Sequence, residues 1–172
     1  RSRGLGDVYK RQDEELLFSL PPNDVFVTSA CVAFWQYEPE YVDDLVLKLH
    51  NHFKDNFMLE IQAHNTDKQK QLNAHILELS KKYDIQMIVG LDSHYIYPEQ
   101  AIERDELLAA SNTHYDDEDG WYMDYPDETT VRKRFAEQGI ISVDDVDKAI
   151  KNTDLICDFE DYQSEVFETN RK

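Results

Sequence analysis

The chain has 172 residues, of which 41% are hydrophobic and 12% are aromatic, so its composition can build the core of one compact domain. Lys and Arg number 18 against 36 Asp and Glu, and the net charge of -18 excludes a clamp that attracts nucleic-acid phosphates. No apolar run approaches the roughly 20 residues that cross a bilayer, and two cysteines without a CxxC pair give no disulfide framework. We therefore expect a soluble, cytoplasmic protein without a membrane partner.

The first 12 residues, RSRGLGDVYKRQ, differ in charge from the rest of the chain. They carry four basic residues and one acidic residue, and they do not begin with Met. The segment resembles a translated adapter or assembly scar, so we interpret residues 1 to 12 as a non-native or disordered leader. The polar end ETNRK suggests a truncation at the other terminus as well.

Strand-like and helix-like patterns alternate along the next part of the chain. The expected elements are, in order, a buried strand at residues 25 to 33, a helix carrying Val42, Leu45, Val46, Leu49 and Phe53, a strand at 57 to 61, a helix carrying Leu72, Ile76, Leu79 and Tyr83, and a strand at 85 to 91. Such alternation at short spacing requires right-handed crossovers, so we predict an α/β fold with a parallel sheet or barrel. Helical patterns alone follow, at 98 to 111, 127 to 138 and 143 to 157.

The sharpest local signal is LDSHYIYP, residues 91 to 98, where the last predicted strand ends. If the chain stays extended, Asp92 and His94 point to one face roughly 6.5 to 7 Å apart, near enough to serve adjacent metal ions. That end of a parallel strand faces the active site in α/β folds, and a carboxylate with an imidazole suits Zn, Mn or Fe for phosphoester hydrolysis. The simpler alternative is a turn-capping Asp92 and a packed His94, which the spacing alone favours because real sites need three or more ligands.

Other residues fall near the same predicted edge. Cys31 can supply a thiolate from a neighbouring strand, although a buried Cys is usually a small apolar residue. His64 follows the strand FMLEIQ and can face this edge, as can Glu60, whose alternation with apolar residues also fits an interstrand hydrogen bond. In the loop HYDDEDGWYMDYP, which holds His114, the acidic residues 116 to 119 lack the spacing of a calcium loop and indicate a solvated charge run.

Three motifs occur in a fixed order: Ser29-Ala30-Cys31, then LEIQAH at residues 59 to 64, then DSHYIYP at 92 to 98. Together they resemble the second half of the PHP (polymerase and histidinol phosphatase) domain of bacterial and phage DNA polymerase III alpha subunits, which carries Ser-Gly-Cys, Leu-Glu-Leu-Gln-x-His and Asp-x-His-Tyr-x-x-Pro in that order. A later helix also fits the family pattern, through Ala149, Asn152, Thr153, Ile156 and Cys157. The resemblance extends from about residue 13 to about residue 160.

The resemblance implies a partial, distorted β/α barrel of the PHP type at residues 13 to 97 and a mainly helical connector toward a missing polymerase palm at 98 to 172. It implies Cys31, Asp92 and His94 as metal ligands, with Glu60 and His64 adjacent to the site. The remaining ligands belong to the first half of the domain, which this sequence lacks, so no complete catalytic set is expected. The implied cofactors are Zn, Mn or Fe at this site and Mg in the missing palm.

The implied function is that of a fragment, itself inactive, of a replicative DNA-directed DNA polymerase. Its expected partners are the remainder of the polymerase chain, a proofreading exonuclease, a sliding clamp, and DNA through the missing domains. Two alternatives stay open: a free-standing phosphoesterase similar to histidinol phosphatase, and a catalytically silent scaffold that binds a replisome partner. The helical stretch after residue 98 argues against the free-standing enzyme, because a compact phosphatase has little need of it.

Overall fold

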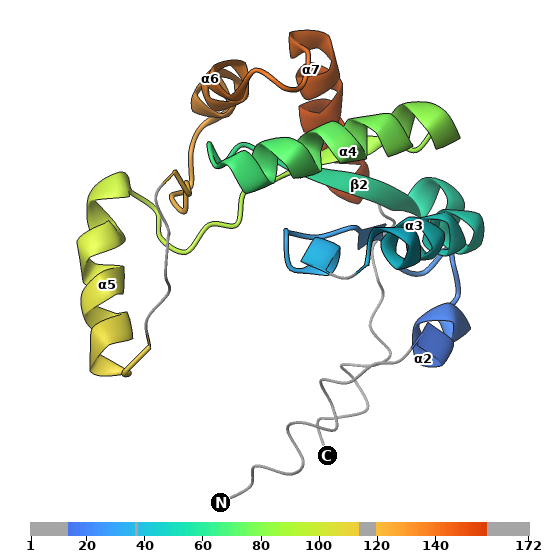
Figure 1. Cartoon of the computed structure of the whole chain (residues 1–172), viewed down its shortest axis with the longest axis horizontal. Helices are drawn as coiled ribbons and strands as arrows, with labels where there is room; N and C mark the ends of the chain where they lie inside the picture. Colours follow the sequence, from blue (N-terminus) through green and yellow to red (C-terminus); the bar gives the residue numbers. More distant parts are fainter. Residues whose placement is uncertain (1–13, 37, 114–119, 158–172) are drawn as a thin grey trace, which may run out of the picture.

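The computed structural model describes residues 14–36, 38–113 and 120–157 (Figure 1). Within them lies one parallel sheet with the order β1-β2-β3, made of β1 (Val27–Thr28), β2 (Phe57–Gln62) and β3 (Met87–Gly90). The predicted α/β class with adjacent parallel strands is confirmed, and closure of these strands into a barrel stays a prediction. The leader at residues 1 to 12 lies outside the described residues.

Helices make up most of the described chain. The α-helices are α2 (Glu14–Ser19), α3 (Pro39–Phe53), α4 (Asp67–Tyr83), α5 (Ala101–Ala110), α6 (Glu128–Gln138), α7 (Val143–Lys151) and α8 (Asp154–Cys157), with short 3-10 turns η1 (Phe34–Gln36), η2 (Lys54–Asn56) and η3 (Pro98–Gln100). The single helix expected at 143 to 157 is interrupted after Lys151, where the Asn152 side chain donates to the Met87 carbonyl at 2.8 Å. That bond ties the end of α7 to β3.

The core lies between the sheet and the helices that cover it. In β2, Phe57, Leu59 and Ile61 are at most 1% exposed and belong to the main apolar cluster. Figure 1 shows α4 lying across β2. The helices complete the cluster with Val42, Val46, Leu49 and Phe53 of α3, Leu72, Ile76 and Leu79 of α4, Val131 and Phe135 of α6, and Val146 and Ala149 of α7. The helical periodicity therefore placed most buried residues of α3 and α4 correctly, although Leu45 and Tyr83 are only partly buried. The alternation in β2 did not predict the burial of Met58, which is 0% exposed.

The first predicted strand is much shorter than expected. The sequence pattern predicts an extended chain over residues 25 to 33, yet β1 covers only Val27–Thr28. The Ser29 amide still donates to the Met58 carbonyl at 3.1 Å, but Ala30 has a φ of 52° and the chain then turns into η1. Cys31 thus lies in a turn after the strand, because a left-handed residue cannot continue a strand.

Replacing Ala30 with Gly should raise the free energy of unfolding by about 0.5 to 1 kcal/mol. A left-handed conformation costs a residue with a Cβ about 1 to 2 kcal/mol, and the larger unfolded-state entropy of Gly offsets part of that gain. Chemical denaturation of both proteins measures the change. Ala136→Gly in the exposed part of α6 is the matched control and should have the opposite sign. A destabilised Ala30→Gly protein would contradict the turn geometry.

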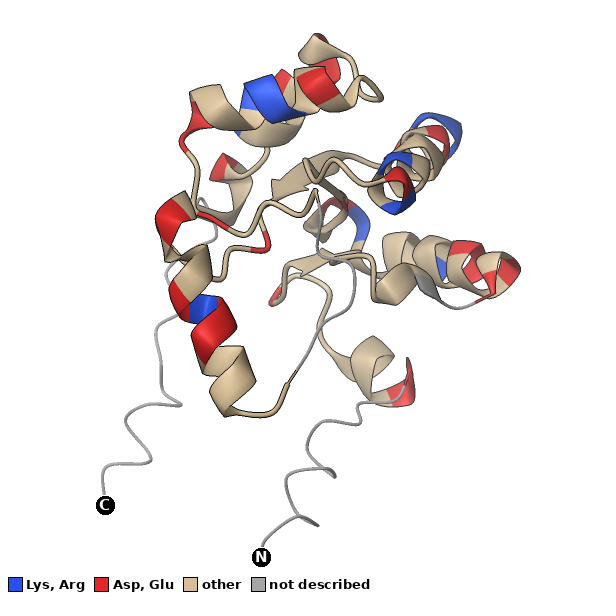
Figure 2. Cartoon of the chain, turned by 60° about the vertical axis from the view of Figure 1, so that its left-hand side comes forward, with Lys and Arg blue, Asp and Glu red and all other residues tan. Residues whose placement is uncertain are grey.

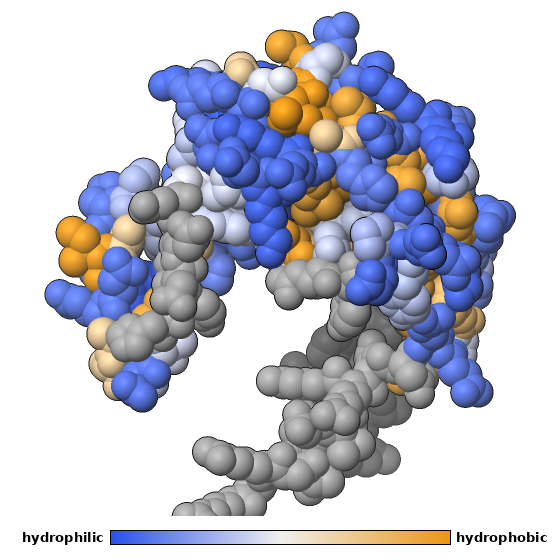
Figure 3. Space-filling model, viewed as in Figure 1, coloured by the Kyte–Doolittle hydropathy of each residue, from blue (hydrophilic) through white to orange (hydrophobic). Residues whose placement is uncertain are grey.

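The periphery of the molecule is polar, and one helix stands apart. None of the residues of α5 is buried, and Figure 1 shows this helix away from the sheet. Acidic residues outnumber basic ones along the helices in Figure 2, and the face in Figure 3 is mostly hydrophilic. No helix in the described ranges is long and apolar enough to cross a membrane.

Candidate metal centre

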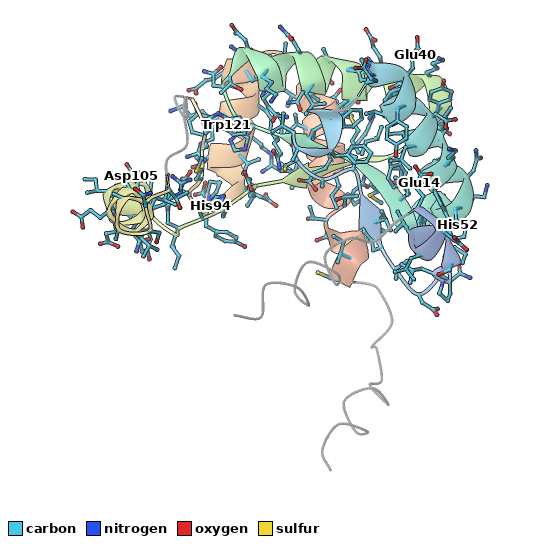
Figure 4. All side chains as sticks on the ribbon, turned by 60° about the horizontal axis from the view of Figure 1, so that its bottom comes forward. Glu14, Glu40, His52, His94, Asp105 and Trp121 are labelled. Atoms are coloured by element: carbon cyan, nitrogen blue, oxygen red, sulfur yellow. The ribbon has the colours of Figure 1, made fainter. Side chains whose placement is uncertain are left out.

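The carboxyl ends of the three strands meet at one edge of the sheet, because all three run parallel. Cys31 follows β1, His64 follows β2, and Asp92 follows β3. Chain order and parallel pairing thus place these residues at the same edge, as predicted. In Figure 4, His94 and Trp121 lie on the side of α5, away from Glu14 and His52.

Asp92 and His94 form a close pair in a turn rather than on an extended strand. The strand β3 ends at Gly90, and Asp92 has a φ of 51°. The chain is therefore not extended here, and the turn brings His94 Nε2 to 3.6 Å from Asp92 Oδ1. Two ligands of one tetrahedral zinc ion lie about 3.4 Å apart. The pair therefore suits a single shared cation, and both side chains are partly exposed and accessible.

A third ligand does not join this pair within the described residues. No group of three or more His, Cys, Asp or Glu side chains in those ranges is arranged to hold a metal ion. Cys31 is a free, half-buried cysteine at the same edge. His114 and the acidic residues 116 to 119 lie outside the described residues. The donor set present thus fits a divalent cation chemically but supplies two close ligands.

His64 is a buried neutral imidazole next to the pair. It is 2% exposed, and its Nδ1 accepts the Tyr122 backbone N–H at 3.0 Å. The proton of the neutral ring is therefore on Nε2, which is buried without a hydrogen-bond partner in the structure. Burial lowers the pKa of His64 to about 4, with a further lowering from Arg134, against an opposing effect of Asp92. In this tautomer His64 is a hydrogen-bond donor and not a metal ligand.

The stability of the protein should fall between pH 7 and pH 5 because of His64. The unfolded imidazole gains a proton near its ordinary pKa of 6.5, whereas the folded one does so only near pH 4. His64 therefore contributes its full stabilisation above pH 6.5 and loses it as the pH falls toward 4. At 1.36 kcal/mol per pH unit, the loss at pH 5 is about 2 kcal/mol.

Denaturation of the wild type and of His64→Asn at both pH values measures this loss. Asn has no titrating group and can place an acceptor where Nδ1 lies, so it should remove this part of the pH dependence while keeping the bond to Tyr122. An equal pH dependence in the two proteins would show that His64 titrates normally in the folded state.

The Glu60 side chain makes one hydrogen bond to the neighbouring strand β1 and one within its own strand β2. Its carboxylate accepts from Thr28 Oγ1 and from Gln62 Nε2, each at 2.9 Å. A Cβ at Gly90 would collide with this carboxylate, so the glycine in β3 makes room for it. The structure thus shows the hydrogen-bonding role for Glu60 that its alternation suggested, and places it across all three strands.

Sequence reasoning missed the packed second part of the acidic loop. Met123 is 8% exposed and Asp124 is 6% exposed, and the Asp124 carboxylate accepts from Arg134 of α6 at 2.7 Å. The Arg134 guanidinium also lies over the Tyr122 ring, 4.2 Å from its centroid. The aromatic residues that separate this stretch from the acidic run were the available signal for a packed segment.

These features define the class of protein. It is an α/β domain with a carboxylate–imidazole pair at the carboxyl end of a parallel sheet. No family model matches the chain. A DNA-directed DNA polymerase of Bacillus phage SPbeta is 29% identical over 180 residues, which cover 90% of this chain and 13% of that protein. The expected resemblance is confirmed, because this chain and parts of such polymerases are homologous.

Two bacterial relatives match shorter stretches. The DNA polymerase III subunit alpha of Aquifex aeolicus is 35% identical over 72 residues, 42% of this chain and 6% of that subunit. The corresponding subunit of Thermus aquaticus is 35% identical over 95 residues, 51% of this chain and 8% of that subunit. The chain thus spans a small part of the curated relatives it matches.

Proposed function

We propose that this chain is part of the PHP domain and its helical connector in a replicative DNA polymerase of the DNA polymerase III alpha type. The match to polymerases over 90% of the chain supports this role. DNA synthesis in the whole protein would use residues outside this chain, and the remainder of the polymerase is its principal partner. The connector corresponds to the helices α5 to α8, which follow the last strand.

The carboxyl edge is, in this proposal, a partial site for one divalent cation of the Zn, Mn or Fe type. The observation that carries it is the 3.6 Å spacing of Asp92 Oδ1 and His94 Nε2. Asp92 and His94 would hold the cation, and Cys31, which follows β1 on the far side of β2, is the third candidate. A bound cation of this kind supplies Lewis acidity for phosphoester hydrolysis. Two close ligands instead of three predict weak binding by the chain alone.

A calorimetric titration of the 172-residue chain with zinc tests the site. The wild type should bind one equivalent weakly, and His94→Ala should abolish binding. His75→Ala is the matched control, because His75 Nε2 also lies near a carboxylate, 2.8 Å from Asp43 Oδ1, and has similar exposure. Equal loss in both variants, or binding by neither variant nor wild type, would refute the assignment.

A silent scaffold is the second candidate function, favoured by the absence of a three-ligand cluster in the described residues. In that case the wild type would bind no zinc, and the domain would act through its surfaces. The same titration therefore separates the two candidates.

A further inference from the structure

A short segment, residues 121 to 126, packs along the turn that carries Asp92 and His94. We call this segment the clasp. Its Met123 carbonyl accepts the His94 backbone N–H at 2.7 Å, and the Ser93 hydroxyl donates to the Asp124 carbonyl at 2.8 Å. The clasp therefore contacts the turn at Ser93, which lies between the two candidate ligands, and at His94 itself.

The clasp is itself held in place by the body of the protein. Arg134 of α6 donates to the Asp124 carboxylate at 2.7 Å, and the two side chains are 14% and 8% exposed. His64 Nδ1 accepts the Tyr122 N–H at 3.0 Å. These contacts tie the clasp to α6 and to His64, which follows β2. The clasp can therefore hold the turn in one conformation.

We propose that Ser93, together with the Asp124–Arg134 pair, positions Asp92 and His94 for one cation. This inference rests on the proposed cation site and extends it to residues that touch no cation. The turn needs support because Asp92 has a φ of 51°, a conformation that an unsupported chain rarely adopts. Without the clasp the turn samples other conformations, and binding must then select the one in which both ligands converge.

Ser93 is the residue on which the inference is best tested. It lies between the two ligands, it is exposed, and its hydroxyl bond reaches across 31 positions of sequence to the clasp. Removing the hydroxyl takes away this link without opening the core. A protein with Ser93→Ala should therefore keep its stability while its turn loosens.

The experiment compares zinc titration and amide hydrogen exchange in the 172-residue wild type, Ser93→Ala and Ser93→Thr. Loss of support around metal ligands typically weakens affinity about 10- to 100-fold, so Ser93→Ala should bind about tenfold more weakly. Exchange of the His94 amide, which is bonded to Met123, should become severalfold faster. Ser93→Thr keeps the hydroxyl, so its zinc affinity and its His94 exchange rate should equal those of the wild type. The thermal midpoints of all three proteins should agree.

Ser80→Ala is the matched control, because the Ser80 hydroxyl makes the same kind of bond, 2.7 Å to the Ile85 carbonyl, at the opposite edge of the sheet. It should leave zinc affinity and His94 exchange unchanged. Unaltered affinity and exchange in Ser93→Ala, or an equal loss of affinity in Ser80→Ala, would overturn the positioning role while leaving the cation site intact. A wild type that binds no zinc would instead overturn the cation site, and the positioning role with it.

Discussion

Replacing Asn73 with Ala should lower the free energy of unfolding by about 3 to 5 kcal/mol. Asn73 is 0% exposed and links three elements. Its Nδ2 donates to the Gln62 carbonyl at 2.8 Å and to Gln138 Oε1 at 2.7 Å, and its Oδ1 accepts from Gln69 Nε2 at 2.9 Å. Truncation leaves the Gln138 and Gln69 groups buried without this partner, and each stranded group costs about 1 to 3 kcal/mol.

Urea denaturation of the two proteins measures this loss. Asn51→Ala is the matched control, because Asn51 is an exposed residue within α3. It should change stability by less than about 0.5 kcal/mol, as exposed substitutions usually do. If Asn73→Ala cost no more than Asn51→Ala, the buried network between α4, β2 and α6 would contribute nothing to the fold.

Replacing Arg134 with Met should cost about 3 kcal/mol. The substitution leaves the Asp124 carboxylate, 8% exposed, without its 2.7 Å ionic partner. Removing one member of a buried ion pair strands a charge in a poorly hydrated site, which typically costs about 3 to 5 kcal/mol. We take the lower value because both side chains keep some contact with water.

The double variant Asp124→Leu/Arg134→Met should recover part of this loss, since no charge is then stranded. Arg132→Met tests whether the effect belongs to the buried pair, because Arg132 lies on the same helix and pairs with Glu128 and Asp147 at the exposed surface. It should leave the unfolding free energy nearly unchanged. Equal losses in the Arg132 and Arg134 single variants would refute a special role for the buried pair.

Local sequence patterns are enough to locate the elements with strong periodicity and the order in which they connect. The apolar spacing along α4 depends on local geometry, so it is readable without knowledge of the fold. The burial of β2 on both faces is a tertiary feature that the alternation did not predict. Strand and helix alternation predicted parallel pairing, and parallel pairing placed Cys31, His64 and Asp92 at one edge. The ordered motifs indicated the polymerase relationship that the comparisons bear out.

The arrangement of that edge, by contrast, depends on contacts between segments that are distant in the sequence. The left-handed backbone at Ala30 ends β1 early, and the same backbone region at Asp92 brings two candidate ligands to one-ion spacing. The tautomer of His64 is set by Tyr122, 58 positions away in the sequence. These features depend on hydrogen bonds between distant segments, and neither periodicity nor local propensity contains information about which donor a folded chain will place beside which acceptor.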